Sequence, residues 1–257
     1  MTTSDAPGQQ HLEARCQSVN PTEGDTRRKR EQVRDMFDHI APSYDTMNRL
    51  MSFGIDRLWR RELVSVLAKA RPRTILDIAT GTGDLAILLA EKLHPESVTG
   101  LDLSEEMVEV GRRKVLAAEL SDVITLETGD SLNLPYADES FDAVTVAYGV
   151  RNFEDLLRGY REMHRVLRPG GILCVLELST PTNPLALPLY RVYTGHVIPL
   201  MGKLIAHDRG AYDYLPRSIA AVPQGKQMLA IIDAAGFRSS ACHPMTMGAC
   251  TLYVARK

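Results

Sequence analysis

The chain has 257 residues, of which 44% are hydrophobic and 24% are charged, and its formal net charge is -2 at pH 7. These values are ordinary for a globular protein with one sizeable α/β domain, and the small net charge gives no case for nucleic-acid binding. No apolar run reaches the roughly 18 residues of a membrane-spanning helix, and the N-terminus lacks a secretory apolar segment. Four cysteines without metal-ligand spacing favour a reducing compartment, so we expect a cytoplasmic protein without a metal site.

The first part of the chain predicts a tail followed by helices. Residues 1–26 are polar throughout and predict a mobile tail. Residues 27–30 are all basic, and two interpretations are weighed: a solvated helix start, which we favour, and attraction to anionic lipid headgroups. An amphipathic helix face follows at the spacing i, i+3, i+4, i+7, formed by Val33, Met36, Phe37 and Ile40.

Residues 41–60 are rich in methionine and aromatic side chains, and a helix is predicted over 61–70, ended by Pro72. Ordinary core packing is the default interpretation of such a stretch. Because it precedes the first strand, it could also fold over a ligand cleft. We therefore expect residues 27–72 to form an N-terminal helical lid on a single domain that spans residues 27–257.

The rest of the chain alternates between strands and helices. Strands are predicted over 74–78, 97–102, 123–130, 141–148 and 171–178, separated by segments of helical length. Residues 180–222 break the alternation and predict a helical insertion, and the chain ends with a helix over 223–235 and an antiparallel hairpin over 237–256. The fold class is α/β: a mostly parallel seven-stranded sheet with helices on both faces.

A glycine turn joins the first strand to its helix. Gly81-Thr-Gly83-Asp-Leu-Ala86 fits the dinucleotide pattern G-x-G-x-x-G/A, and Asp102 lies about 20 residues further on, where an acid binds a ribose hydroxyl. An NAD-dependent dehydrogenase is one interpretation. A P-loop is excluded because no Lys-Ser/Thr pair follows the glycines.

Three features in order resemble the class I Rossmann-like methyltransferases: the acidic glycine motif from Asp77 through Ala79 to Gly83, Asp130 at the end of the third strand, and the turn at 167–171. The resemblance implies S-adenosyl-L-methionine as cofactor. Asp102 can accept from both ribose hydroxyls, and the turn offers N–H groups to a carboxylate. The cofactor-binding residues expected are Asp77, Gly81, Thr82, Gly83, Asp102, Asp130 and Ser131.

Four further motifs resemble the UbiE/MenG (COQ5) family of quinone C-methyltransferases. They are Tyr44-Asp45-x-Met47-Asn48-x-x-Met51-Ser52 with Trp59, Gly149-Val150-Arg151-Asn152, the segment 165–179, and Tyr212-x-Tyr214-Leu215-x-x-Ser218-Ile219. The resemblance extends from residue 33 to the C-terminus. Four positions depart from the family: Asp56 replaces a common His, Tyr148 a common Ser, Asp130 a common Asn, and Arg168 a common Lys.

The family resemblance implies methylation of a polyprenylated hydroquinone, with demethylmenaquinol converted to menaquinol. A ubiquinone-pathway benzoquinol, or another lipid or small aromatic acceptor, is the alternative. A cofactor-binding regulator without catalysis is the rival from another class. The catalytic residues implied are Arg151, Asn152 and Tyr44, with Arg151 stabilising a phenolate because its pKa is too high for a base.

The insertion has two interpretations, and the sequence favours neither over the other. Its apolar helices could line a channel for the isoprenoid tail, or they could cap the sheet and form a homodimer contact. Peripheral contact with the inner face of a membrane is a further option for a protein with a polyprenylated substrate.

Overall fold

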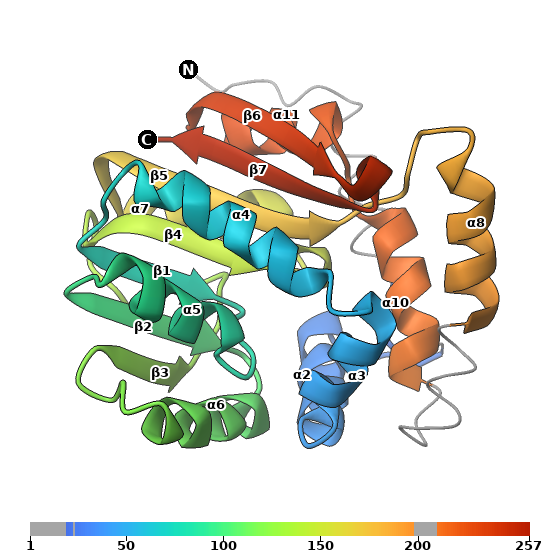
Figure 1. The fold of residues 1–257 in the computed structure, drawn as a ribbon, viewed down its shortest axis with the longest axis horizontal. Coiled ribbons are helices and arrows are strands. Elements are labelled where there is room, and N and C mark those ends of the chain that lie inside the picture. The colour runs from blue at the N-terminus through green and yellow to red at the C-terminus, as the bar shows by residue number, and fades with distance from the viewer. Residues whose placement is uncertain (1–18, 23, 198–209) are drawn as a thin grey trace.

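The computed structural model describes residues 19–22, 24–197 and 210–257 (Figure 1). Most of the tail predicted over 1–26 lies outside these residues. A seven-stranded sheet in the order β3-β2-β1-β4-β5-β7-β6 forms the centre. Its strands are β1 Thr74–Ile78, β2 Ser97–Asp102, β3 Ile124–Thr128, β4 Phe141–Ala147, β5 Leu167–Leu178, β6 Arg238–Met245 and β7 Cys250–Arg256.

The sheet confirms the predicted fold class. Strands β1 to β5 pair parallel with one another, whereas β7 runs antiparallel to both β5 and β6. From β1 the chain first adds strands on one side of the sheet and then, with β4 and β5, on the other. The order therefore reverses between β1 and β4, and the carboxyl ends of these two strands flank a crevice of the kind in which open α/β sheets bind ligands.

Helices cover both faces of the sheet. Helices α4, α5 and α6 share one apolar core with one face, and α7 and α11 share a second core with the other. A third, smaller cluster joins α2, α3, α6 and α10. The helices are α2 Lys29–Ile40, α3 Tyr44–Ser52, α4 Asp56–Ala68, α5 Asp84–Leu93, α6 Glu105–Ala117, α7 Leu156–Val166, α8 Ala186–Val192, α10 Gly210–Ala221 and α11 Lys226–Ala234.

The N-terminal helices and the insertion lie at the carboxyl edge of the parallel strands. Figure 1 shows the arrowheads of β1, β4 and β5 pointing toward α2, α3, α8 and α10. The insertion is helical where it is described, as predicted, with a π-helical turn at Tyr193–Val197 after α8. Its residues 198–209 lie outside the described part of the chain.

The boundaries of α4 and β5 differ most from the prediction. Helix α4 begins at Asp56, five residues before the predicted start, because the Asp56 carboxylate lies in the first turn and pairs with Arg60 one turn on. The expected turn at 168–171 is a bulge inside β5: Phe141 pairs with Leu167, and pairing then resumes between Ala143 and Ile172. Because β5 is hydrogen-bonded to β4 on both sides of the bulge, the predicted turn and the predicted strand form one continuous strand.

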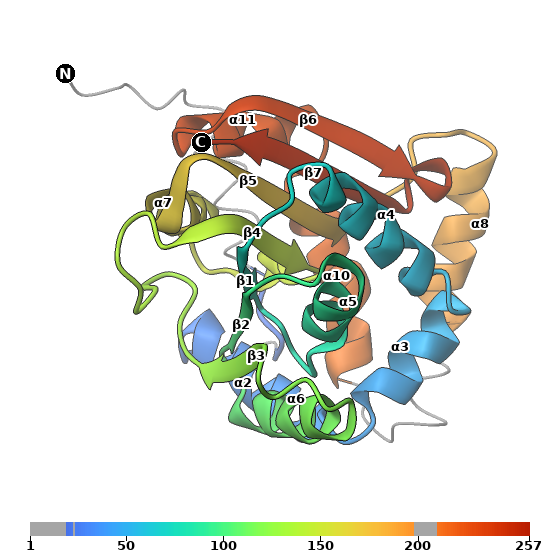
Figure 2. The same ribbon diagram turned by 60° about the vertical axis from the view of Figure 1, so that its left-hand side comes forward.

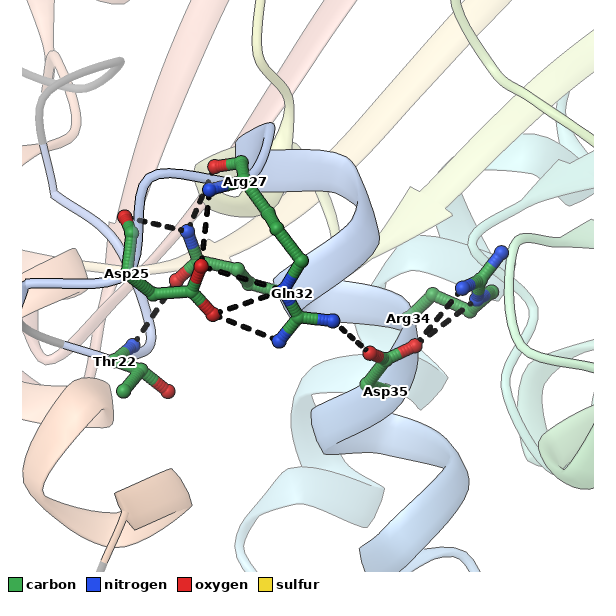
Figure 3. A network of polar contacts seen from close by, with 6 residues as sticks. All are labelled: Thr22, Asp25, Arg27, Gln32, Arg34 and Asp35. Atoms are coloured by element: carbon green, nitrogen blue, oxygen red, sulfur yellow. Dashed lines mark hydrogen bonds and ion pairs between the residues drawn. The ribbon is translucent and has the colours of Figure 1, made fainter.

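Side chains of the basic run at 27–30 bind other residues of the protein. Arg27 binds Asp25 and Asp35, and Gln32 accepts from the Thr22 N–H and donates to the carbonyls of residues 25 and 27 (Figure 3). The Lys29 ammonium is buried and donates to the Arg151 carbonyl at 3.1 Å. The favoured interpretation of a solvated helix start is therefore wrong for Lys29, whereas Arg27, Arg28 and Arg30 are exposed as it expects. Attraction of the run to lipid headgroups stays a prediction.

Candidate active site

A polar cleft opens where the strand order reverses. It has a volume of about 760 Å³ and is lined by the ends of β1, β2 and β4, by the loop after β3 and by α2. Six predicted residues line this cleft: Tyr44, Gly81, Asp102, Asp130, Ser131 and Asn152. Four of the seven predicted cofactor-binding residues thus come together from three separate strand ends.

The glycine turn leaves one wall of the cleft open. Gly81 has a φ of +55°, and no heavy atom lies within 4 Å of the position that its Cβ would occupy. Its N–H donates to Asp102 Oδ2 at 2.7 Å, and Asp102 Oδ1 accepts from the Ser104 N–H. The Gly83 N–H donates to the Thr80 carbonyl. The N–H groups of Gly81 and Gly83 therefore bind within the protein. That other N–H groups of the turn bind a ligand carboxylate stays a prediction.

The acids of the cleft have different partners. Burial raises the pKa of Asp102, and hydrogen bonds from the backbone N–H groups at residues 104 and 81 lower it. Asp130 pairs with Arg30 of α2, with Oδ2 3.1 Å from Nη1, and its Oδ1 accepts from the Leu132 N–H. Arg30 comes from the basic run, and no sequence motif placed it in this cleft.

Three predicted cofactor-binding residues do not line the cleft. Asp77 is only 1% exposed, and its carboxylate accepts from Thr80 Oγ1 at 2.7 Å and from Thr145 Oγ1 at 2.6 Å. Thr82 donates to Asp45 of α3 at 2.6 Å. Gly83 has a φ of +78° and begins α5. These three residues therefore stabilise the conformation of the turn and do not face the cleft.

The buried Asp77 carboxyl gives a pH-dependent expectation. Burial raises its pKa to about 6, although the two threonine hydroxyls oppose the shift. Between the ordinary pKa of 3.8 and about 6 the folded chain holds a proton that the unfolded chain has released, so this group's contribution to stability falls as pH rises through that window. Asp77→Asn, which cannot ionise, should therefore gain up to about 3 kcal/mol over the native chain between pH 4 and pH 7. Urea unfolding of both proteins at several pH values measures the difference, and a pH-independent difference would contradict it.

A larger apolar cavity adjoins the polar cleft. It has a volume of about 1550 Å³, and its walls come from α3, α4, α8, α10 and the turn between β6 and β7. Aromatic and aliphatic side chains dominate its lining, among them Met51, Phe53, Trp59, Leu189, Tyr190, Tyr193, Leu215 and Ile219. Tyr44 and Tyr148 line both spaces and so form a shared wall.

Arg151 and Asn152 follow β4 but reach different spaces. Arg151 lines the apolar cavity, whereas Asn152 lines the polar cleft and accepts from the Tyr214 hydroxyl at 3.1 Å. The buried Arg151 guanidinium pairs with Glu177 of β5, with Nη1 2.8 Å from Oε1. Burial alone would lower the Arg151 pKa, but the Glu177 carboxylate raises it above its usual value. The guanidinium therefore stays a cation at the cavity wall.

Tyr148 is a residue that the sequence singled out only as a departure. It follows β4 with a φ of +62°, and its hydroxyl is buried without a hydrogen-bond partner among the described residues. The Trp59 ring packs against it at 6.5 Å between centroids, and the Arg60 guanidinium lies 5.4 Å from its ring centre. Burial raises its pKa well above the usual value, so the phenol stays neutral.

Charged side chains link the N-terminal helices to the glycine turn. Lys114 of α6 pairs with Asp45 of α3 at 2.7 Å and with Asp84 at the start of α5. Arg60 of α4 pairs with Asp56 and lies 3.8 Å from Asp84. One network thus ties α3 and α4 to the turn beneath the polar cleft.

The described residues contain neither a membrane-spanning helix nor a metal-binding cluster. No helix in 19–22, 24–197 or 210–257 is both long and apolar enough to cross a membrane. The same residues contain no group of three or more His, Cys, Asp or Glu side chains placed to hold a metal ion.

Comparisons with known proteins agree on one family. The model of the ubiE/COQ5 methyltransferase family matches residues 25–257. A demethylmenaquinone methyltransferase of Bacteroides fragilis is 47% identical over 241 residues, covering 94% of this chain and 98% of the relative. A ubiquinone/menaquinone biosynthesis C-methyltransferase UbiE of Geotalea daltonii is 43% identical over 230 residues, covering 89% and 97%.

The solved structures extend the likeness to the fold. The crystal structure of an S-adenosylmethionine-dependent methyltransferase of Aquifex aeolicus matches 72% of this chain and 81% of its own with a TM-score of 0.53. At 18% sequence identity, the match concerns the fold alone.

Proposed function

The chain belongs to the ubiE/COQ5 methyltransferase family, and from that premise we propose that it transfers a methyl group from S-adenosyl-L-methionine to a ring carbon of demethylmenaquinol, giving menaquinol. The observation that carries the proposal is the wall shared by the two spaces. A polar cleft suited to a nucleoside meets an apolar cavity suited to an isoprenoid quinol at Tyr44 and Tyr148. Methyl transfer needs donor and acceptor side by side.

The residues of the polar cleft fit the cofactor. Gly81 leaves room for a ligand to approach the backbone, and Asp102 accepts from hydroxyl groups such as those of a ribose. Asp130, Ser131 and Asn152 supply the polar atoms that an adenine edge and an amino acid need. S-Adenosyl-L-methionine bound there supplies a methyl group on a cationic sulfur.

The residues of the shared wall and the cavity act on the acceptor. A quinol ring carbon becomes a nucleophile when the neighbouring hydroxyl ionises, and the new carbon–methyl bond replaces a C–H bond whose hydrogen leaves as a proton. Arg151 stabilises the phenolate as a buried cation. Burial raises the Tyr44 pKa, so Tyr44 remains a neutral donor that can bind a ring oxygen. Asn152 holds its place beside the cofactor through Tyr214.

The N-terminal helices and the insertion have complementary parts in this proposal. Helices α2 to α4 form a lid whose side chains line both spaces, and α8 and α10 wall the apolar cavity around the isoprenoid tail. This division corresponds to the lid at 27–72 and the insertion at 180–222. The homodimer contact is the remaining alternative for the insertion.

Calorimetry separates this proposal from a dehydrogenase. S-Adenosyl-L-methionine should bind with a dissociation constant in the micromolar range, whereas NAD should give no heat of binding at the same concentration. The reason is chemical: a dinucleotide turn gives backbone N–H groups to the pyrophosphate, but those of Gly81 and Gly83 bind within the protein, and Arg30 is already paired with Asp130. Preferential binding of NAD would end the proposal.

The single tryptophan gives a direct test of the acceptor site. Trp59 lines the apolar cavity, so a short-chain demethylmenaquinone should quench the fluorescence of the chain in a saturable way. Methyl transfer should then be assayed with short-chain demethylmenaquinol and with a short-chain ubiquinone-pathway benzoquinol, because the relatives carry both names. Faster transfer to the benzoquinol would shift the proposal to the ubiquinone pathway.

A further inference from the structure

The exposed apolar side chains of this protein are concentrated at one place. Eight large hydrophobic side chains are exposed among the described residues, and all but Leu116 belong to three segments. The corner between α3 and α4 carries Leu50, Phe53 and Leu58. Helix α8 and the residue before it carry Leu185, Leu189 and Val192, and the turn between β6 and β7 carries Met247. We call these seven side chains the apolar rim.

The apolar rim surrounds the mouth of the apolar cavity. Phe53, Leu189 and Met247 each line the cavity while being 64% or more exposed, so they stand where the cavity meets solvent. Figure 2 shows α3, α8 and the turn between β6 and β7 on the right of the molecule, whereas β3 lies toward its left. The rim is therefore continuous with the space proposed for the quinol.

Helix α8 presents an apolar stripe outward. Leu185, Leu189 and Val192 are spaced i, i+4 and i+7 and are 87%, 73% and 56% exposed. The inner side of the same helix, with Ala186 and Tyr190, lines the cavity. Helix α8 is thus apolar on both sides, but the rest of the protein covers only its inner side. An exposed apolar helix face of this kind is typical of an interaction surface.

The charges beside the rim are mostly positive. In residues 46–62 and 183–197, the exposed side chains that carry a charge at pH 7 are Arg49, Arg57, Arg61 and Arg191, with Glu62 as the one acid. None of the four arginines forms an ion pair with another described residue, in contrast to Arg27 and Arg30 of the N-terminal basic run. Unpaired arginines around an apolar patch suit a negatively charged apolar surface.

We propose that the apolar rim docks on an anionic phospholipid bilayer, so that the mouth of the cavity opens against the lipid. The proposal rests on the proposed function, since a polyprenylated quinol dissolves in the bilayer and would then enter the cavity without crossing water. A second copy of the chain fits the rim less well. A two-fold interface places each patch against itself and would bring the rim arginines of the two copies together.

Vesicle sedimentation of the full chain tests the proposal. The native protein should bind vesicles of equal parts phosphatidylglycerol and phosphatidylcholine, and should bind pure phosphatidylcholine vesicles less tightly. Leu58→Gln combined with Leu185→Gln should weaken binding roughly tenfold, because two apolar side chains no longer enter the lipid. Neither residue lines the cavity. Leu116→Gln is the matched control, since Leu116 is 70% exposed on α6, away from the rim, and should bind like the native chain.

Methyl-transfer assays separate failure of this proposal from failure of the proposed function. The double variant should methylate a short-chain quinol in water at the native rate and a long-chain quinol in vesicles about tenfold more slowly. Vesicle binding that is equal in the native chain and the double variant, with normal methyl transfer, would overturn the docking proposal alone. No methyl transfer to either quinol, with rim-dependent vesicle binding, would overturn the function alone. A native dimer that Leu58→Gln/Leu185→Gln converts to a monomer would assign the rim to a second copy.

Discussion

Arg151→Gln should lower methyl transfer at least about a hundredfold while binding of S-adenosyl-L-methionine persists. The guanidinium lines the apolar cavity and not the polar cleft, so its loss removes the cation beside the acceptor without touching the cofactor wall. The same substitution should reduce the free energy of unfolding by about 3–5 kcal/mol, because it leaves the buried Glu177 carboxylate without its partner. Initial rates, calorimetry and urea unfolding measure the three effects.

A double variant separates catalysis from stability. Arg151→Gln combined with Glu177→Gln removes both charges and should bring the free energy of unfolding back to within about 1–2 kcal/mol of the native value, since neutral amides replace the buried pair. Methyl transfer should stay as low as in the single variant. Recovery of methyl transfer together with stability would show that Arg151 only holds the fold.

Gly149→Ala should destabilise the protein by at least about 2 kcal/mol and weaken cofactor binding. A Cβ at this position would lie 2.4 Å from the Ala79 Cβ and 3.1 Å from Val146 Cγ1. Val146 lies in β4, and Ala79 directly follows β1. These two central strands cannot move apart without loss of their hydrogen bonds. Gly149 and Ala79 also line the polar cleft, so relief of the clash would displace the cofactor wall. Thermal unfolding and calorimetry measure the two effects.

The matched control moves the side-chain methyl group from position 79 to position 149. Ala79 has a φ of +53°, a conformation that glycine adopts without strain. Ala79→Gly alone should therefore be neutral or stabilising, and Ala79→Gly with Gly149→Ala should recover most of the lost stability and cofactor affinity. A double variant as unstable as Gly149→Ala would mean that contact with Val146, and not with Ala79, decides the cost.

The order of elements could be predicted from the sequence because each strand and helix carries its own local signal. The run at 74–78 and the hairpin at the C-terminus both depend on residues close in the chain, and both predictions were confirmed. The family followed from spaced motifs and was confirmed by the comparisons. The start of α4 was missed because its signal is an ion pair between Asp56 and Arg60, which apolar periodicity does not show.

The sequence by itself determined the fold class and the family, and it predicted several of the residues that line the cleft. Only the tertiary structure decided which of the predicted residues face a ligand. Asp77 and Asp102 are both acids at strand ends, yet Asp77 lies under the turn between two threonines and Asp102 lies in the cleft. Burial, the pairing of Arg151 with Glu177 and the rim around the apolar cavity depend on contacts between segments far apart in the chain. Local patterns carry no information on such contacts, because they arise from how the elements pack.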